Sequence, residues 1–438
     1  MNSAVKPIAE RAKLASRRLA TIPTEQRNAG IRAAADTVQR AAPQLLEANA
    51  KDLTVAGELL ANGQITSATF ERLRITDQKI NEMARSMRAV ADLPDPVGRV
   101  LQRIELDRRL VLEKITCPLG LLAVIFEARP DAVTQISSLA LKAGNGVILK
   151  AGREVEQTAT ALVATIRRSL AQSELPEEAV TLVVGREAVR ELLKLSGVID
   201  MVIPRGSKQL VEFVQANTRI PVLGHAEGVC HIYVDAAADL PMALDIIDDA
   251  KTDYPAACNA VETVLAHEAI AAVFLPMLAE RLRAKSVKLR GCEKTRAILG
   301  VQIVEVIAAD EWHCEYSDLV LAMRVVGSMD DAIRHIHDYG SSHTETIVTE
   351  DRVAAERFLA EVDAAGVFHN ASTRFADGYR YGFGAEVGIS TSKLHARGPV
   401  GVEGLTTYKY VLRGTGQVAH SYHAPNGRPF THKRMPAE

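Results

Sequence analysis

The sequence predicts an α/β protein with two doubly wound parallel-sheet domains and a β-ribbon. From Leu121 onward, short apolar segments alternate with amphipathic segments of helical period, and a second alternating stretch begins at Cys230. Strands and helices that alternate in this way form parallel β-α-β units, in which the sheet is covered on both faces. A strand-like segment at 103–120 and another at 404–416 lie outside this alternation and predict the ribbon.

The N-terminal part, from Lys6 to about Met87, is predicted to be helical, because its apolar residues recur with helical spacing among Arg, Glu, Gln and Ala. Two prolines and a glycine between positions 94 and 98 end this pattern. Residues 103–120 then change to strand-like alternation, with a run of β-favouring residues at 110–115. We therefore expect an exposed ribbon here, between two helical parts of the chain.

The first alternating stretch predicts a doubly wound sheet. Its first helix has Pro130 early in the first turn and Gly144 as a stop. The strands are predicted at 121–126, 146–150, 180–184, 199–203 and 220–223, and the helices at 129–144, 155–170, 187–196 and 207–217. The second stretch, which continues to about residue 390, has apolar segments at 230–235, 260–265, 301–307, 318–326 and 345–350.

The charge balance argues against nucleic acid and anionic membranes as partners. The chain has 52 basic and 54 acidic residues, and no apolar run approaches the roughly 20 residues that a bilayer requires. Five scattered cysteines without a zinc-like spacing predict free thiols in a reducing compartment, and hence a cytoplasmic protein without a metal site. The basic N-terminus also allows a transit peptide, although an amphipathic helix is the favoured interpretation.

The alternating strands suggest a nucleotide site, although the motif G-x-G-x-x-G is absent after every predicted strand. Two features lie where ligands of such sheets bind, at the carboxyl ends of strands. Lys150 ends one strand, and Gly206 and Ser207 open a helix whose first N–H groups suit phosphate. A solvated strand end and an ordinary N-cap explain the same residues equally well.

Cys258 lies in the segment DYPAACNAVETVL (253–265), after two alanines and shortly before a predicted strand. A lone cysteine is usually a small and inert buried residue. Small neighbours can instead leave a thiol within reach of a substrate, and the alternative is therefore a nucleophile.

Several long segments resemble the gamma-glutamyl phosphate reductase family of the aldehyde dehydrogenase superfamily. They are FEARPD (126–131), YPAACNAVETVL (254–265), VVGSMDDAIRHIHDYGSSHTETI (325–347), NASTRFADGYRYGFGAEVGIST (370–391) and RGPVGVEGLTTYKYVLRGTG (397–416). The resemblance covers essentially the whole chain and implies an aldehyde dehydrogenase-like fold. It implies an NADP-binding domain at 1–100 and 119–229, a catalytic domain at 230–403, and a β-ribbon for oligomerisation at 101–118 and 404–438.

The family reduces L-glutamyl 5-phosphate to L-glutamate 5-semialdehyde with NADPH, in the second step of proline biosynthesis, and the resemblance implies this reaction here. Cys258 falls on the catalytic cysteine, which would form a thioester as phosphate leaves. Lys150 falls on a lysine that contacts the adenosine ribose, and Gly206 and Ser207 fall on the turn under the pyrophosphate. Glu315 falls on a glutamate that binds the nicotinamide ribose.

Two departures from other aldehyde dehydrogenases are informative. Hydrolytic members have a water-activating glutamate where this chain has Gly224, although a shifted alignment would place Glu227 there. Loss of that base suits a reductase, whose thioester must not be hydrolysed. Three residues after Lys150, NAD-preferring relatives often have glutamate, whereas this chain has Arg153, which suits the 2′-phosphate of NADPH. A surface arginine at a helix start is the alternative.

The implied substrate carries phosphate, carboxylate and ammonium groups, so its site needs cations and an acceptor. Arg129, at the N-terminus of a predicted helix, is the expected anion ligand, and Glu127 is its partner or a ligand for the ammonium group. The resemblance adds Asn370 and Ser372 as substrate-binding candidates. Arg397, Lys393, His225, His343 and Glu386 are weaker candidates, for which ordinary solvated or hydrogen-bonded roles serve as well.

Beyond the small-molecule substrate, the expected partners are other copies of this chain. Larger relatives are fused to a glutamate kinase, so the acyl phosphate is expected here from a separate glutamate 5-kinase. Two other functions stay open. The missing glutamate argues against an oxidising semialdehyde dehydrogenase, and the presence of Cys258 argues against a non-catalytic nucleotide-binding relative.

Overall fold

The computed structural model describes residues 5–224, 227–423 and 427–437. The chain divides into two compact units. The first unit comprises Met1–Leu223, Phe383–Gly388 and Val400–Glu438, and the second comprises Gly224–Gly382 and Ile389–Pro399. Residues 383–388 and 400–403, which lie inside the predicted catalytic range of 230–403, thus belong to the first unit.

The N-terminal segment is helical, as predicted, and its long helices bury side chains that recur with helical spacing. In α5 the buried positions Ile80, Met83, Ala84 and Met87 recur every three or four residues. Threonine side chains cap two of the helices by accepting a backbone N–H of the first turn. The helices are α1 (Val5–Leu19), α2 (Thr24–Arg40), α3 (Ala42–Ala61), α4 (Ser67–Leu73) and α5 (Asp77–Asp92).

A four-stranded parallel sheet of order β5-β4-β3-β6 forms the core of the first unit. Every residue of β3 is buried, as expected for a strand covered on both faces. The strands are β3 (Leu121–Phe126), β4 (Gly146–Ala151), β5 (Val180–Val183) and β6 (Met201–Arg205). The helices are α6 (Ala132–Lys142), α7 (Glu156–Gln172), α8 (Arg186–Leu192) and α9 (Lys208–Ala216), with short 3-10 turns η1 (Arg153–Val155) and η2 (Glu177–Ala179).

Two predictions for this unit need correction. The segment 220–223 is not a strand but a single bridge between Val202 and Val222, because Pro221 has no N–H to continue a ladder. Arg129 is not in the helix predicted at 129–144, since α6 begins only at Ala132 after a turn in which Ala128 has a φ of 47°. The predicted stop is confirmed, because Gly144 has a left-handed φ of 73° directly after α6.

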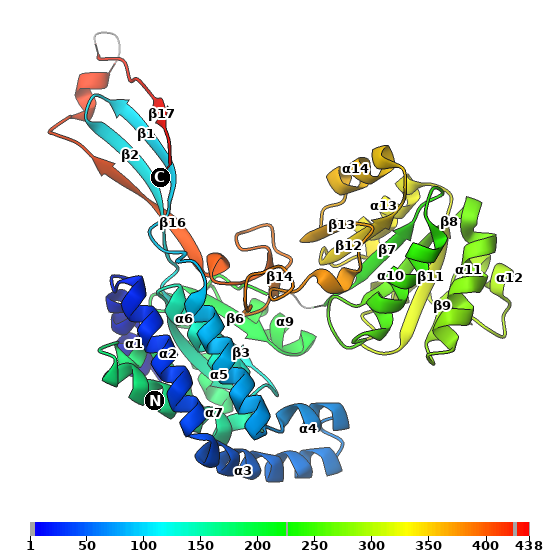
Figure 1. Ribbon diagram of the computed structural model, residues 1–438, viewed down its shortest axis with the longest axis horizontal. Coiled ribbons are helices and arrows are strands. Elements are labelled where there is room, and N and C mark those ends of the chain that lie inside the picture. The colour runs from blue at the N-terminus through cyan, green and yellow to red at the C-terminus, as the bar shows by residue number, and fades with distance from the viewer. Residues whose placement is uncertain (1–4, 225–226, 424–426, 438) are drawn as a thin grey trace. The chain divides into compact units, whose positions relative to one another are not determined.

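The second unit contains a seven-stranded sheet of order β10-β9-β11-β8-β7-β12-β13, in which all pairs are parallel. Successive residues of β7 face opposite layers: Ile232 packs in the cluster with α10 and α11, and Tyr233 packs in the cluster with α13 and α14. Figure 1 shows these helix pairs beside the sheet. The predicted doubly wound arrangement is therefore confirmed for this unit.

The strands of this sheet are β7 (Cys230–Val234), β8 (Val261–His267), β9 (Lys288–Gly291), β10 (Glu305–Val306), β11 (Val320–Val326), β12 (Thr344–Val348) and β13 (Gly366–His369). The helices are α10 (Leu240–Thr252), α11 (Glu268–Arg283), α12 (Glu293–Leu299), α13 (Met329–Tyr339) and α14 (Arg352–Glu361), with η3 (Ala309–His313) and η4 (Thr373–Phe375). A small antiparallel pair joins β14 (Ile389–Ser390) and β15 (Gly398–Pro399).

The strand-like segments near residue 110 and after residue 404 form one antiparallel sheet of order β16-β2-β1-β17. Figure 1 shows these strands, which are far apart in the sequence, side by side. They are β1 (Val100–Asp107), β2 (Leu110–Pro118), β16 (Thr406–Arg413) and β17 (Lys433–Met435), with the 3-10 turns η5 (Glu403–Leu405) and η6 (Ala419–Tyr422). Among the helices described, none is long and apolar enough to cross a membrane.

Candidate active site

Cys258 lies in the loop between the end of α10 and the start of β8, a strand at the centre of the seven-stranded sheet. Its thiol is free and half-buried. Two turn hydrogen bonds shape the loop: the Ala257 N–H donates to the Tyr254 carbonyl over 3.1 Å, and the Ala260 N–H donates to the Ala257 carbonyl over 2.9 Å. The loop thus presents its cysteine at the mouth of a strand whose own side chains are almost all buried.

Gly228 packs directly against the backbone of Cys258. A Cβ atom at Gly228 would lie 1.9 Å from the Cys258 carbonyl oxygen, so only glycine allows this approach. The Gly228 N–H donates to Glu315 Oε2 over 2.9 Å, and Cys230 Sγ donates to the Cys258 carbonyl over 3.4 Å. The structure therefore brings Glu315 to the segment that contacts Cys258.

A buried ion pair lies at the base of the same loop. Lys251 Nζ, near the end of α10, donates to Glu262 Oε2 on β8 over 2.8 Å, and both side chains are fully buried. Burial raises the pKa of Glu262 to about 7, against the opposing effect of Lys251, and the negative charge of Glu315 adds to the rise. Glu262 also accepts the Ser317 N–H over 3.4 Å, so the pair is tied to the segment that follows Glu315.

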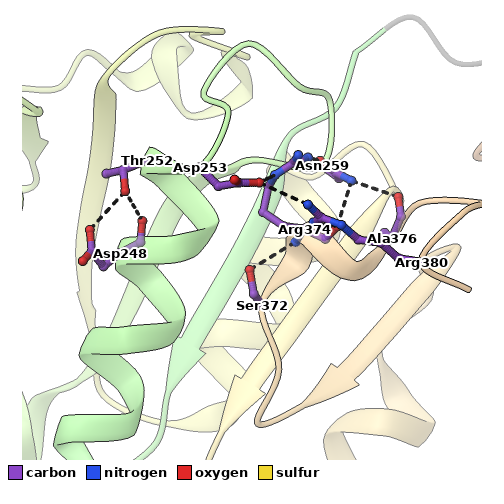
Figure 2. A network of polar contacts seen from close by, with 8 residues as sticks. All are labelled: Asp248, Thr252, Asp253, Asn259, Ser372, Arg374, Ala376 and Arg380. Atoms are coloured by element: carbon purple, nitrogen blue, oxygen red, sulfur yellow. Dashed lines mark hydrogen bonds and ion pairs between the residues drawn. The ribbon is translucent and has the colours of Figure 1, made fainter. Parts of the chain in front are cut away.

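A polar network holds two residues of the loop, Asp253 before Cys258 and Asn259 after it (Figure 2). Arg374 Nε donates to Asp253 Oδ2 over 3.1 Å, and Arg374 Nη1 donates to Asn259 Oδ1. Asn259 Nδ2 donates in turn to the Ala376 carbonyl over 2.9 Å. Sequence reasoning missed Arg374, although it selected Ser372 two residues earlier, because no local pattern shows that Asp253 and Asn259 are its neighbours.

Asn370 and Ser372 lie in the turns that lead into this network, and their side chains bond to nearby backbone. Asn370, with a φ of 52°, accepts the Thr349 N–H over 3.0 Å and donates to the Thr349 carbonyl over 3.1 Å. Ser372 is buried and accepts the Arg374 N–H over 3.3 Å. Their observed bonds thus fix the path of the chain into η4.

In the first unit, Lys150 lies at the carboxyl end of β4, as predicted, and is partly buried. Burial lowers the pKa of Lys150, and the carboxylates of Glu154, Glu156 and Glu127 partly offset this effect. Arg153 begins the 3-10 turn η1 directly after β4 and is exposed. Both side chains therefore lie at the strand-end position expected for a nucleotide site.

Gly206 and Ser207 lie between β6 and α9, where the Ser207 hydroxyl caps the helix by accepting the Leu210 N–H over 3.4 Å. Glu127 Oε2 accepts the Ser207 N–H over 3.0 Å, and a Cβ at Gly206 would lie 2.3 Å from that oxygen. Glu127 is therefore not the partner of Arg129. Because β3 and β6 are neighbours, the end of β3 places Glu127 beside the Gly-Ser turn.

The Arg129 side chain, half-buried in the β3–α6 turn, makes no hydrogen bond or ion pair with the part of the chain that the structure describes. Arg397 and Lys393 both pair with Asp363, the arginine over 2.8 Å. His343 is buried with its Nδ1 2.9 Å from Thr344 Oγ1, and His225 lies outside the described residues. Within the described ranges, no group of three or more His, Cys, Asp or Glu side chains is arranged to hold a metal ion.

The predicted site residues thus form two groups, one in each compact unit. The first unit contains Glu127, Arg129, Lys150, Arg153, Gly206 and Ser207, and the second contains Cys258, Glu315, Asn370 and Ser372. Within the second group, Cys258 and Glu315 are linked through Gly228, and Ser372 is linked to the Cys258 loop through Arg374.

Comparison with known proteins identifies the family of this chain. Residues 2–303 match the aldehyde dehydrogenase family. A gamma-glutamyl phosphate reductase from Synechococcus sp. (strain JA-2-3B'a(2-13)) is 52% identical over 425 residues, which cover 96% of this chain and 92% of that protein. The chain belongs to the gamma-glutamyl phosphate reductases of the aldehyde dehydrogenase family. A relative of the same name from Cyanothece sp. (strain PCC 7425 / ATCC 29141) is 52% identical over 428 residues, or 98% of this chain and 97% of that protein.

Solved structures confirm the predicted fold class. The crystal structure of gamma-glutamyl phosphate reductase from Thermotoga maritima matches with a TM-score of 0.91 and 40% identity, over 95% of this chain and all of that chain. An acetylating aldehyde dehydrogenase from Geobacillus thermoglucosidasius matches with a TM-score of 0.65 and 17% identity, over 94% of this chain and 97% of that chain. The second likeness supports the family fold alone.

Proposed function

We propose that this chain reduces L-glutamyl 5-phosphate to L-glutamate 5-semialdehyde with NADPH, as the second step of proline biosynthesis from glutamate. The names of its relatives supply the reaction class. The observation that supports the chemistry is Cys258, a free and half-buried thiol in a loop of small residues. Cys117, Cys230 and Cys314 have less support as nucleophiles, since burial raises the pKa of each of these thiols.

In this proposal the Cys258 thiolate attacks the acyl carbon, the C–O bond to phosphate breaks, and inorganic phosphate leaves as the thioester forms. NADPH, when bound, supplies the hydride that reduces the thioester carbon. The resulting hemithioacetal oxyanion collapses, the C–S bond breaks, and the Cys258 thiolate is regenerated with release of the aldehyde. The net reaction consumes one proton and one NADPH for each phosphate released.

The first unit offers a set of residues that fits the cofactor. Lys150 ends β4 with its ammonium group partly buried, and Gly206 and Ser207 form the turn before α9, where only glycine fits beside Glu127. Members of the aldehyde dehydrogenase family use nicotinamide cofactors, and Arg153 supports NADPH because it can bond to a 2′-phosphate. We assign Glu315 to the nicotinamide ribose, and Arg129, Glu127, Asn370 and Ser372 to the substrate.

Gly224 supports reduction over oxidation, because it leaves no carboxylate at the position from which hydrolytic relatives activate water. The five free cysteines support a reducing, cytoplasmic compartment, and a separate glutamate 5-kinase would supply the substrate. The ribbon strands are assigned to homo-oligomer formation.

The reverse assay tests the proposed function. Purified protein should reduce NADP⁺ in the presence of glutamate semialdehyde and phosphate, and turnover should require both. Cys258→Ala should abolish turnover, because no other group forms the thioester, whereas Cys292→Ala should leave turnover close to wild type. Turnover that persists in Cys258→Ala, or that does not depend on phosphate, would contradict the mechanism.

A further inference from the structure

The loop that carries Cys258 is closed at its base by the Lys251–Glu262 ion pair. Lys251 lies in the last turn of α10 and Glu262 is the second residue of β8, so their 2.8 Å contact joins the two ends of the loop. Lys251 also donates to the Asp318 carbonyl over 3.1 Å. The base of the loop is thereby fixed by buried groups, and residues 253–260 form a tip that must be held by other contacts.

Arg374 spans this tip from one side to the other. Its Nε bonds to Asp253 at the start of the tip, and its Nη1 bonds to Asn259, the residue directly after Cys258 (Figure 2). Asn259 and Arg374 are both buried, with 3% and 9% of their surface exposed. One planar guanidinium therefore bonds to residues on both sides of the sulfur, and its rigid fork of donors fixes their separation.

Arg374 and Asn259 each donate a hydrogen bond to the other. Asn259 Nδ2 donates back to the carbonyls of Arg374 and Ala376, so the amide is bonded at both its oxygen and its nitrogen. Arg380 reinforces the network by donating to the Arg374 carbonyl over 2.6 Å and to Asp253 Oδ2 over 3.2 Å. Hydrogen bonds from Arg380 and then from Arg374 lower the pKa of Asp253, so this carboxylate remains charged at neutral pH.

We infer that Arg374 is a positioning residue for the reaction, which holds Cys258 in the geometry of attack through Asp253 and Asn259. This inference rests on the proposed role of Cys258 as the nucleophile. Arg374 does not itself need to touch the substrate. Because thioester formation requires the sulfur close to the acyl carbon and aligned with it, a loop that is no longer held lowers the rate of the step more than it changes binding.

The test compares Arg374→Met with Arg374→Lys and with the wild-type protein in the phosphate-dependent reverse assay. Arg374→Met should lower kcat by about a hundredfold with little change in KM, since a displacement of about 1 Å can have such an effect on rate. Arg374→Lys keeps the positive charge but lacks the guanidinium that bonds to two residues at once. Its kcat should therefore lie between that of Arg374→Met and that of the wild-type protein. The reaction of Cys258 with iodoacetamide should become faster in Arg374→Met, because the freed tip exposes the thiol.

Arg281→Met is the matched control. Arg281 bridges Asp245 and Asp248 on the same helix α10, at 2.7 Å and 2.8 Å, without bonding to the tip, so kcat should remain close to wild type. Cys230, which is fully buried beneath the loop, reports unfolding: peptide mass spectrometry should find Cys258 alkylated and Cys230 unmodified. If Arg374→Met does not fold, Asp253→Asn replaces it, with the same expected loss of kcat and the same KM.

Wild-type kcat in Arg374→Met, or an equal loss in Arg281→Met, would overturn the positioning role. Modification of Cys230 alongside Cys258 would show that the variant is unfolded, and Asp253→Asn then decides the question by the same two outcomes. Failure of the proposed function looks different. In that case the wild-type protein has no phosphate-dependent turnover, or Cys258→Ala retains it, while the alkylation rates still show whether Arg374 holds the loop.

Discussion

Under the proposed function, a single residue of the first unit is expected to decide which nicotinamide cofactor the protein favours. Arg153 begins η1 three residues after Lys150, at the end of β4, and its guanidinium is exposed. A guanidinium forms strong charge-assisted hydrogen bonds with a phosphate dianion, whereas a carboxylate at the same place repels it. The charge at this one position is therefore expected to separate NADPH from NADH.

We predict that Arg153→Glu reverses the cofactor preference. The KM for NADPH should rise by about tenfold or more, since the loss of one charge-assisted bond has roughly that effect, and the KM for NADH should fall. Steady-state kinetics with both cofactors measure this. Arg168→Glu, an exposed arginine on α7, makes the same charge change and should leave the ratio of the two KM values unaltered. An unchanged ratio in Arg153→Glu would mean that this arginine does not contact the cofactor.

The sequence did not predict which residues of distant segments contact one another. Cys258 and Lys150 could be selected because their local surroundings, small neighbours and a strand end, carry the signal. Arg374 could not, because Asp253 is 121 positions away. Glu127 was selected as a partner of Arg129 or as a ligand for the ammonium group. Its bond to the Ser207 N–H was not predicted, because a sequence does not show that β3 and β6 are adjacent strands.

At the scale of elements, the segment before β7 can contact the Cys258 loop because Gly228 has no side chain. Gly228→Ala would place a methyl group 1.9 Å from the Cys258 carbonyl oxygen, so one of the two backbones must move. We predict a fall in kcat of about a hundredfold, because the displaced loop moves the sulfur. Gly57→Ala is the control, since a Cβ there meets nothing within 4 Å, and its activity should equal wild type.

Circular dichroism and thermal melting should show that Gly228→Ala remains folded. Full activity in this variant would show that the loop tolerates the displacement, and that the close contact has no role in the chemistry.

Elements were predictable where periodicity was strong. The segments 121–126, 146–150 and 230–235 became strands because each is a short apolar run in a sheet covered on both faces. The prediction of strands was less accurate where an apolar segment forms few hydrogen bonds with a neighbouring strand. The segment 301–307 contributes only the two-residue edge strand β10, since the residues after Gly300 form a turn first.

At the scale of the whole molecule, the ribbon sheet offers a surface for association. Its edge strand β16 presents Tyr408, Tyr410 and Leu412 at alternate positions, with 48%, 60% and 54% of their surface exposed. An exposed edge strand with apolar side chains favours pairing with another chain. We therefore predict that the protein forms homo-oligomers through β16.

The double variant Tyr410→Lys with Leu412→Lys should shift the protein to a smaller species, because two charges would have to be buried in the interface. Size-exclusion chromatography with light scattering measures the mass. Val353→Lys changes another exposed apolar residue, on α14, and should leave the mass unaltered. A wild-type monomer, or an unchanged mass in the double variant, would contradict the prediction.

The central position of β8 in the sheet protects it from local unfolding. β8 is the fourth of seven strands, and it and its neighbour β7 are buried along nearly their whole length. Central strands exchange their amide hydrogens last, since their opening requires disruption of most of the sheet. Fraying at β10 or β13 therefore leaves the strand that follows Cys258 in place, and deuterium uptake should be slowest in the peptides from β7 and β8.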